Sequence, residues 1–359
     1  MSQSLEKNIN ADAVALAHDA MADEYDHMDD LWYPWLFAQI HEFIAQNLPV
    51  INNRRPKALD VGCGTGLQSF LLSRVGYDVT AFDLAEKLIE VAVAKIPSQA
   101  SPPLCVPPLF PSKSWNGIDR HNQRMAYLLE SKRFNRAVKP PFFLSADVND
   151  FDFEENKYGV IVCCGSVLSF VDNYDIIIKK MAGALTENGV IFLEVEQKRN
   201  MDLIWPIVDN LAGGKLGYEQ RWGEVLRNLF SPRGKSIKID YPFELNDGNE
   251  VILPMWLFSV NELALLFQKN NLQIKDRMGI HWATNILPST ILHRTDLGRF
   301  IMKMEESLMY LDGRMGRCWP MWRLGCSVVY CLERGQWRRN GNQLSEQHKN
   351  GTIANKKHD

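Results

Sequence analysis

The sequence of 359 residues has no uninterrupted apolar stretch long enough to cross a membrane, which takes roughly 20 residues. Its N-terminus is polar and acidic and lacks a basic region followed by an apolar run, so we expect no secretory signal. The seven cysteines show no paired spacing, which favours free thiols in a reducing compartment. Together these absences predict a cytoplasmic protein without a membrane span.

Metal ligands and excess positive charge are also lacking. No group of histidines and cysteines has the spacing of a metal site, so we expect no structural or catalytic metal. The formal net charge is −3 and the pI is about 6.3, which argues against nucleic acid as a partner. Residues 112–139 lean basic, however, and a solvated surface is the simpler interpretation of that patch. Nothing in the sequence indicates an oligomeric state.

The most informative segment that is present covers residues 58–66, Ala-Leu-Asp-Val-Gly-Cys-Gly-Thr-Gly. An apolar strand runs into three alternate glycines, Gly62, Gly64 and Gly66, and a helix with apolar residues at helical spacing begins at Leu67. Glycines let a ligand lie directly on backbone N–H groups at a helix start, where a side chain would block its approach. The segment therefore predicts a ligand-binding turn between a strand and a helix.

Two carboxylates accompany this turn. Asp60 precedes the first glycine in the pattern D-x-G-x-G-x-G, and Asp83 ends the next apolar strand, about 20 residues after the glycines. Dinucleotide-binding proteins use G-x-G-x-x-G instead, whose glycines make room for a pyrophosphate. Asp60 would repel a pyrophosphate but suits a cationic ligand with an amino-acid part, and Asp83 can grip two ribose hydroxyls. The alternative is a tight strand–helix turn of some other α/β protein.

This pattern resembles the first two motifs of class I S-adenosylmethionine-dependent methyltransferases. The resemblance implies that the glycine turn holds the methionine part of S-adenosylmethionine and that Asp83, with Leu84, holds its ribose. Asp147 and Val148 stand at the end of a later strand, 142–147, where the family reads the adenine amino group. A simple turn former at the strand end is the other interpretation of Asp147.

Residues 11–47 alternate apolar and acidic residues at helical spacing and include Tyr25 within Glu-Tyr-Asp. In the resembling family an N-terminal helical segment folds over the cofactor, and a tyrosine in this context is common. An aromatic ring also attracts a sulfonium cation, so Tyr25 is a candidate cofactor contact. Docking of the helix on the sheet is the alternative. We predict that residues 1–50 form a helical cofactor lid.

The alternation of strands and helices predicts a doubly wound, mostly parallel, Rossmann-like α/β sheet. Residues 158–164 form a continuous apolar run typical of a central strand buried on both faces, and Cys164 ends it where ligands bind in such sheets. The following Gly-Ser-Val-Leu-Ser differs from the Asn/Asp-Pro-Pro-Tyr/Phe motif of methyltransferases that act on nucleobases or amides. Residues 51–199 are the predicted cofactor-binding core, interrupted by a proline-rich insertion at 97–141.

The resemblance also implies that the remaining chain forms a substrate cap and completes the sheet with an antiparallel pair of strands at its edge. Residues 200–258 occupy the cap position and contain a β-hairpin around Asn-Asp-Gly-Asn, 246–249. Residues 259–333 return to the core with an antiparallel edge strand, and residues 334–359 are polar and predicted to be disordered. The candidate walls of the acceptor pocket are aromatic or basic residues of the cap and of the loop beyond it: Trp205, Arg221, Trp222, Tyr241, Trp256 and Trp282.

Methyl transfer from a sulfonium is an in-line displacement with a good leaving group, so the protein mainly has to align the reactants. A hydroxyl acceptor would profit from a general base, and His281, after the penultimate strand, is the candidate. A structural role for this histidine is the alternative. The sequence thus predicts methyl transfer to nitrogen or oxygen of a small-molecule acceptor. An RNA- or protein-directed methyltransferase that uses the basic insertion, or a non-catalytic cofactor-binding scaffold, are the competing hypotheses.

Overall fold

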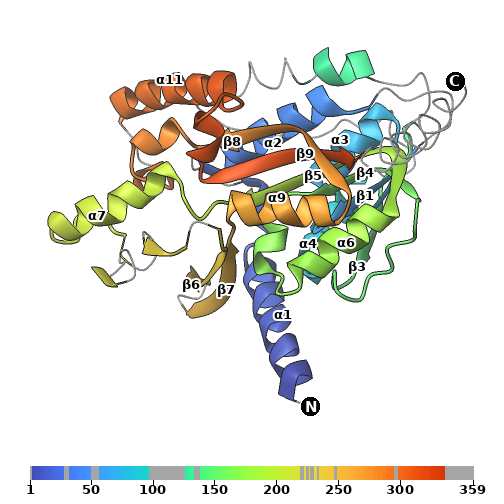
Figure 1. Cartoon of the computed structure of the whole chain (residues 1–359), viewed down its shortest axis with the longest axis horizontal. Helices are drawn as coiled ribbons and strands as arrows, with labels where there is room; N and C mark the ends of the chain where they lie inside the picture. The colour runs from blue at the N-terminus through green and yellow to red at the C-terminus, as the bar shows by residue number, and fades with distance from the viewer. Residues whose placement is uncertain are drawn as a thin grey trace, which may run out of the picture.

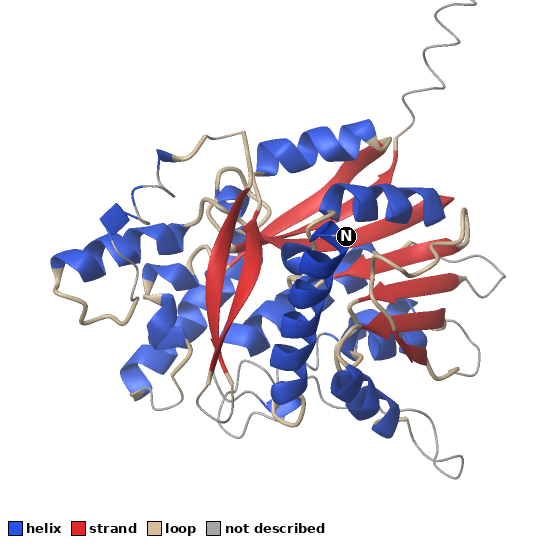
Figure 2. Ribbon diagram, turned by 90° about the horizontal axis from the view of Figure 1, so that it is seen from below, coloured by secondary structure: helices blue, strands red, loops and turns tan. Residues whose placement is uncertain are grey.

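A seven-stranded sheet forms the centre of the molecule, and a two-stranded hairpin stands beside it (Figure 1, Figure 2). The strand order in the large sheet is β3-β2-β1-β4-β5-β9-β8. The computed structural model describes the following residues: 2–27, 32–49, 56–96, 125, 127–132, 138–218, 222–223, 226, 230–232, 234–245, 249–294 and 298–335.

Five neighbouring strands of the large sheet run parallel. Strand β1 lies between β2 and β4, and its residues from the second onward are buried, as its apolar sequence predicts. The carboxyl ends of all five strands meet at one edge, which is where ligands bind in open α/β sheets. The five strands are β1 (Lys57–Val61), β2 (Asp78–Asp83), β3 (Phe142–Ser145), β4 (Tyr158–Cys163) and β5 (Leu185–Glu196).

Two further strands complete the sheet on the side of β5. Strand β9 (Ser327–Arg334) is antiparallel to β5 and also to β8 (Leu272–Ile280), which is the outermost strand. The last strand of the chain is therefore inserted between two earlier ones, and β8 with β9 makes the antiparallel edge pair. The predicted fold class, a mostly parallel Rossmann-like sheet with an antiparallel element at its edge, is confirmed.

Helices cover both faces of the sheet and bury two separate hydrophobic clusters. On one face α2 (Trp32–Asn47) and α3 (Leu67–Val75) pack on the strands. On the other face α6 (Tyr174–Ala184) and α9 (Val260–Lys269) do so. Each large apolar side chain buried in these clusters contributes roughly 1.5–3 kcal/mol relative to its exposed state, so the two layers hold the strand ends in place.

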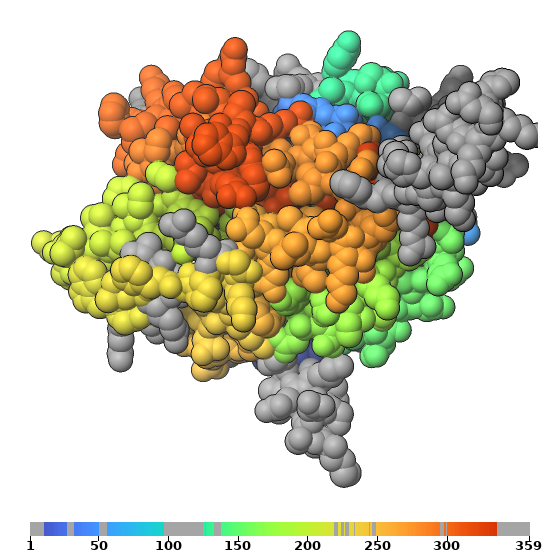
Figure 3. Space-filling view, in the orientation of Figure 1, coloured from blue at the N-terminus to red at the C-terminus, as the bar shows by residue number. Residues whose placement is uncertain are grey.

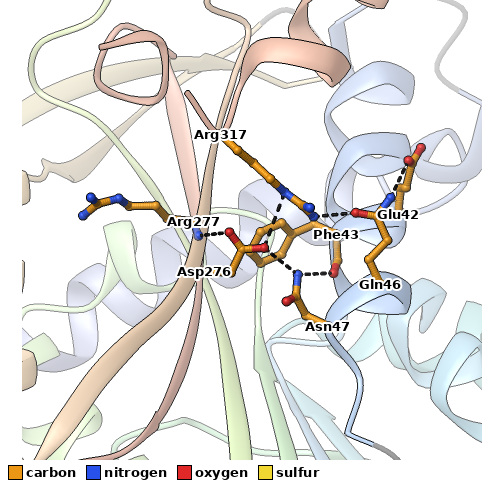
Figure 4. Close-up of polar contacts among 7 residues, drawn as sticks. All are labelled: Glu42, Phe43, Gln46, Asn47, Asp276, Arg277 and Arg317. Carbon is orange, nitrogen blue, oxygen red and sulfur yellow. Dashed lines mark hydrogen bonds and ion pairs between the residues drawn. The ribbon is translucent and has the colours of Figure 1, made fainter. Parts of the chain in front are cut away.

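Helix α2 is also fastened to the edge strand β8 by polar contacts (Figure 4). Asp276 of β8 accepts a hydrogen bond from Asn47 Nδ2 at 3.0 Å and pairs with Arg317 Nε at 3.4 Å. The Arg317 guanidinium lies 5.2 Å from the ring centre of Phe43 and donates to Gln46 Oε1. These contacts fix the helix that begins immediately after the N-terminal segment.

The hairpin predicted in the cap is present as β6 (Ile237–Glu244) and β7 (Glu250–Leu257), paired antiparallel from Ile237–Leu257 to Glu244–Glu250. The hairpin and α7 (Ile204–Leu211) lie on the same side of the molecule (Figure 3). The other helices are α1 (Ser2–Ala20), η1 (Tyr25–His27), α4 (Glu86–Ala94), η2 (Val167–Phe170), η3 (Met201–Leu203), η4 (Thr284–Ile286), α10 (Ser289–Leu292), α11 (Arg299–Met315) and η5 (Met321–Arg323).

Most of the predicted insertion, 97–141, lies outside the described residues, and so does the predicted tail, 334–359, from residue 336 onward. The start of that tail was predicted wrongly, because Arg334 is the last residue of β9. Within the insertion, residues 127–132 are helical, and Leu129 packs into the cluster that α2 and α3 share. In the described part of the chain, no helix is both long and apolar enough to cross a membrane.

One carboxyl group in α11 is buried without a hydrogen-bond partner among the described residues. Glu305 is 1% exposed, and neither of its side-chain oxygens has a hydrogen-bond partner among the described residues. Burial, with a smaller contribution from Asp312, raises the pKa of Glu305 to about 8. The folded state therefore favours the protonated form, and ionisation opposes folding as the pH rises from about 4.5, where this group titrates when unfolded, through 8.

We predict that Glu305→Gln raises the free energy of unfolding at pH 9 by about 2–4 kcal/mol and changes it little at pH 5, because glutamine mimics the protonated carboxyl. Urea unfolding at the two pH values measures the difference. Glu306→Gln, one position along the same helix, is the matched control and should show no pH-dependent gain. Equal effects of Glu305→Gln at both pH values would contradict the assignment.

Candidate functional site

A cavity opens at the carboxyl ends of the parallel strands, between the core and helix α1. Its walls come from the turn after β1, the ends of β2 and β3, the loop after β4, and α1. From α1, Ala11, Val14, Ala15 and His18 contribute. The cavity brings together seven residues that the sequence predicts as cofactor contacts: Tyr25, Gly62, Gly64, Asp83, Leu84, Asp147 and Val148.

Backbone conformation and close packing both require glycine in the turn after β1. Gly62, Gly64 and Gly66 all have left-handed backbones, with φ of 65°, 53° and 85°. A Cβ atom on Gly62 would lie 2.3 Å from Val167, so this glycine allows the loop after β4 to approach. A Cβ on Gly66 would lie 2.8 Å from the Phe143 ring, and Gly66 sits at the start of α3 rather than in the cavity wall.

Asp83 closes the turn from the next strand. Its Oδ2 accepts a hydrogen bond from the Gly64 backbone N–H at 2.8 Å, and its Oδ1 accepts one from Ala85 N–H at 2.9 Å. Two backbone donors on one carboxylate hold the glycine turn against β2. Asp83 lines the cavity, so a carboxylate stands at the predicted ribose position.

Asp60 lies beneath the turn instead of on the cavity wall. It is 2% exposed, and its Oδ2 accepts a hydrogen bond from Ser69 Oγ at 2.6 Å. Burial, with a smaller contribution from Asp83, raises the pKa of Asp60 to about 7. The structure thus places Asp60 as a support that joins β1 to α3.

The turn after β3 and the end of β4 border the opposite side of the cavity. Asp147 Oδ1 accepts hydrogen bonds from the backbone N–H and the side-chain Nδ2 of Asn149, at 2.8 and 2.9 Å. Asp147 therefore forms a local turn and also lines the cavity, and its contact with the adenine amino group stays a prediction. The Cys164 thiol points instead toward the Phe192 carbonyl, 3.8 Å away, and it is the next residue, Gly165, that lines the cavity.

The N-terminal segment is fastened over the glycine turn by a group of contacts centred on Asp26. The ring of Tyr25 lies 3.7 Å from the place where a Gly64 Cβ would stand. Asp26 Oδ1 accepts a hydrogen bond from Thr65 Oγ1 at 2.6 Å, and Asp26 Oδ2 pairs with Lys95 Nζ. Lys95 in turn donates to the Thr65 carbonyl at 2.9 Å. We call Asp26, Thr65 and Lys95 the lid latch.

The predicted acceptor walls are distributed over the cap, and none of those in the described residues lines the cavity. Trp256 Nε1 and Lys238 Nζ both donate to Asp172 Oδ1, at 3.1 and 2.6 Å, and Asp172 does line it. Trp205 Nε1 donates to the Asn285 carbonyl at 2.9 Å. The other candidates are Trp222, which is 43% exposed, Tyr241, which is 38% exposed, the half-buried Trp282, and Arg221, which lies outside the described residues.

His281, the predicted base, is buried away from the cavity wall. One ring nitrogen contacts Thr284 Oγ1 at 2.8 Å and the other contacts the Trp32 carbonyl at 3.2 Å. Its ring stacks on the Trp32 ring at 3.8 Å between centres. Burial lowers the pKa of His281 to about 3. Both nitrogens thus serve contacts that join the end of β8 to the start of α2.

Two glutamates at the end of β5 are additions to the predicted site. Glu194 is fully buried, and its Oε2 accepts the backbone N–H groups of Gly165 and Ser166 at 3.0 and 2.6 Å. Its Oε1 accepts a hydrogen bond from Ser327. Glu196 Oε1 accepts one from Ser166 Oγ at 3.0 Å. The signal in the sequence is that two acids follow the apolar run 190–193 at the end of the strand.

The close approach of Val167 to Gly62 leads to a stability prediction. Gly62→Ala should lower the free energy of unfolding by about 2–4 kcal/mol, because the added methyl group overlaps Val167 and the backbone has positive φ. Denaturant unfolding measures the loss. Gly183→Ala is the matched control, because nothing lies within 4 Å of its Cβ position in α6. That change should leave stability equal or slightly higher, and a harmless Gly62→Ala would refute the packing argument.

Comparison with known proteins adds independent information. A family model described as a methyltransferase domain matches residues 33–276. A ubiquinone biosynthesis O-methyltransferase from Xylella fastidiosa is 49% identical over 51 residues, which is 14% of this chain and 20% of that protein. The Bacillus subtilis protein YqeM is 20% identical over 199 residues, 53% of this chain and 60% of that protein. The chain thus matches less than two thirds of the length of either curated relative.

Among solved structures, an S-adenosylmethionine-dependent methyltransferase from Methanosarcina mazei aligns with a TM-score of 0.45 and 15% identity. The alignment covers 81% of this chain and 97% of that one. The family model spans more than half of the sequence, including the glycine turn, Asp83 and the ends of β3, β4 and β5. The chain belongs to the methyltransferase domain family, and S-adenosylmethionine is its cofactor.

Proposed function

We propose that this protein transfers the methyl group of S-adenosylmethionine to a nitrogen or oxygen atom of a small-molecule acceptor. The observation that carries the proposal is the enclosure of the cavity: α1 forms one wall, and Asp172, another wall residue, is bonded to the hairpin β6–β7. A site covered from two sides suits an acceptor that is small enough to enter beneath the hairpin. It also excludes water from the reacting groups.

Each part of S-adenosylmethionine has candidate partners among the residues around the cavity. The backbone of Gly62 and Gly64 would lie against the methionine part, and Asp83 would accept hydrogen bonds from the ribose hydroxyls. Asp147 would accept from the adenine amino group. The Tyr25 ring would face the sulfonium, which supplies an electrophilic methyl group. The protein's own task is then to hold the acceptor atom in line with that group.

The proposed division of the chain follows from these contacts. Residues 1–50 contain α1 and η1, which we assign to the lid, and α2, which packs on the sheet. Residues 51–199 contain the strands that border the cavity. Residues 200–258 contain α7 and the hairpin, which we assign to the acceptor. The competing RNA- or protein-directed function depends on residues 112–139, most of which lie outside the described residues.

Cofactor binding provides the first test. We expect the wild-type protein to bind S-adenosylmethionine in calorimetric titration and Asp83→Ala to bind it about 10- to 100-fold more weakly, because a charge-assisted contact to the ribose is lost. Asp78→Ala, at the other end of β2, is the matched control and should keep the wild-type affinity. A wild-type protein that does not bind the cofactor would refute the proposed function.

The lid latch provides a second test, based on kinetics. Asp26→Asn removes the charge that pairs with Lys95, so the lid should open more often and S-adenosylmethionine should dissociate about three- to tenfold faster. A stopped-flow chase of bound cofactor measures the rate. Lys87→Met is the control, because it removes a lysine from α4, the helix that ends next to Lys95, and leaves the latch intact. An unchanged rate in Asp26→Asn would mean that the latch does not hold the lid.

A further inference from the structure

Glu196 stands at the border between the cofactor cavity and the cap. It is the last residue of β5, and its Oε1 accepts the hydrogen bond from Ser166 Oγ at 3.0 Å. Ser166 directly follows Gly165, which lines the cavity. The Glu196 carboxyl therefore bonds to the residue next to a cavity-lining one, at the carboxyl ends of β4 and β5.

The backbone that presents Ser166 to Glu196 is held in an unusual conformation. Ser166 has φ of 59°, a left-handed value that is uncommon for a residue other than glycine. The buried Glu194 carboxylate accepts the N–H groups of Gly165 and Ser166 and so stabilises this turn. Strain of this kind is retained where surrounding contacts over-determine it, often next to a functional group. Here the strained turn directs the Ser166 hydroxyl to Glu196.

The backbone of Glu196 contacts the hairpin end of the cap, because its carbonyl accepts a hydrogen bond from the N–H of Phe258, the residue after β7, at 2.8 Å. Burial, with a smaller contribution from the charge of Glu196, raises the pKa of Tyr241 on β6. Phe37 of α2 covers Gly165, with its ring 3.7 Å from the place of a Cβ atom there. Glu196 thus lies between Ser166, which follows the cavity-lining Gly165, and the end of the hairpin.

Glu196 differs from His281, the predicted base, in the hydrogen bonding of its side-chain atoms. Both nitrogens of His281 are used inside the fold. Glu196 uses Oε1 toward Ser166, and its Oε2 accepts no hydrogen bond from the described residues. The side chain is half-buried rather than enclosed. Oε2 is therefore the Glu196 oxygen that has no hydrogen-bond donor within the described part of the fold.

We propose that Glu196 faces the methyl end of the cofactor and accepts the proton that the acceptor releases. The inference rests on the proposed function. When a neutral amine or a hydroxyl is methylated, the acceptor atom forms a bond to the methyl carbon, and the methyl–sulfur bond breaks with its electron pair left on sulfur. One proton leaves the acceptor atom, and Glu196 Oε2 takes it. The acceptor class is thus a compound with an N–H or O–H group.

The surroundings of Glu196 suit a proton acceptor near neutral pH. Burial, followed by the charge of Glu194, raises the pKa of Glu196 to about 8, and Asp202 acts in the same direction. Ser166 opposes them by hydrogen bonding, and Tyr241 is the titratable group on the hairpin side. The carboxylate form is therefore a minor species at pH 7 and the major one at pH 9. A base with this pKa is well matched to an amine or phenol acceptor.

The test uses two cofactor analogues and needs no knowledge of the acceptor. S-Adenosylhomocysteine lacks the methyl group, whereas sinefungin carries an amine in its place. Calorimetric titration of the wild-type protein should show that the preference for sinefungin over S-adenosylhomocysteine increases roughly tenfold from pH 7 to pH 9, because the fraction of ionised Glu196 grows from about 0.1 to about 0.9. The amine stays cationic over this range.

Glu196→Gln should abolish the pH-dependent increase and lower the preference at pH 9 roughly tenfold, with unchanged affinity for S-adenosylhomocysteine. That unchanged affinity also shows that the variant folds. Asp240→Asn, an exposed acid next to Tyr241, is the matched control and should behave as wild type. The inference is overturned if the pH-dependent preference persists in Glu196→Gln. It is also overturned if the wild-type protein binds both analogues but its preference does not change with pH. Both outcomes leave the proposed function standing. Failure of the wild type to bind either analogue overturns both the inference and the proposed function.

Discussion

The hydrogen bond from the Gly64 N–H to the Asp83 carboxylate is the contact on which the site is built. It joins the ends of two adjacent parallel strands and keeps the glycine turn in its left-handed conformation. Because the turn is fixed, Thr65 stands where Asp26 can bond to it, and Gly62 leaves room for the loop after β4. The lid and the adjacent cavity wall are thus both positioned from one short segment.

Much of this arrangement could be predicted from the sequence because its determinants are local. The strand, the three glycines and Asp83 lie within 27 residues, from Lys57 to Asp83, and positive φ at alternate positions is a property that only glycine meets easily. The order of strands follows from the same local patterns, because parallel strands joined by helices have few ways to pack. The hairpin in the cap followed from its turn residues and alternating strands in the same way.

The remainder depends on residues that are far apart in the chain. Nothing near His281 in the sequence shows that Trp32, 249 positions earlier, contacts its ring, so a histidine after a strand looked available as a base. Lys95 could not be assigned to the lid for the same reason, because its partner Asp26 precedes it by 69 residues. The proposed role of Glu196 could not be predicted either, because it depends on the turn at Ser166 and on the hairpin. No local sequence pattern brings these two segments together.

Asp172 has two roles that cannot be separated. One of its oxygens holds both Lys238 and Trp256 of the hairpin, and the same residue forms part of the cavity wall. A molecule that shifts Asp172 together with the hairpin therefore also changes the shape of the cavity. Thermodynamic linkage then requires reciprocity: a compound that tightens cofactor binding by a given factor is itself bound more tightly by that factor when the cofactor is present. A single carboxylate oxygen thus links the hairpin to the wall of the cavity.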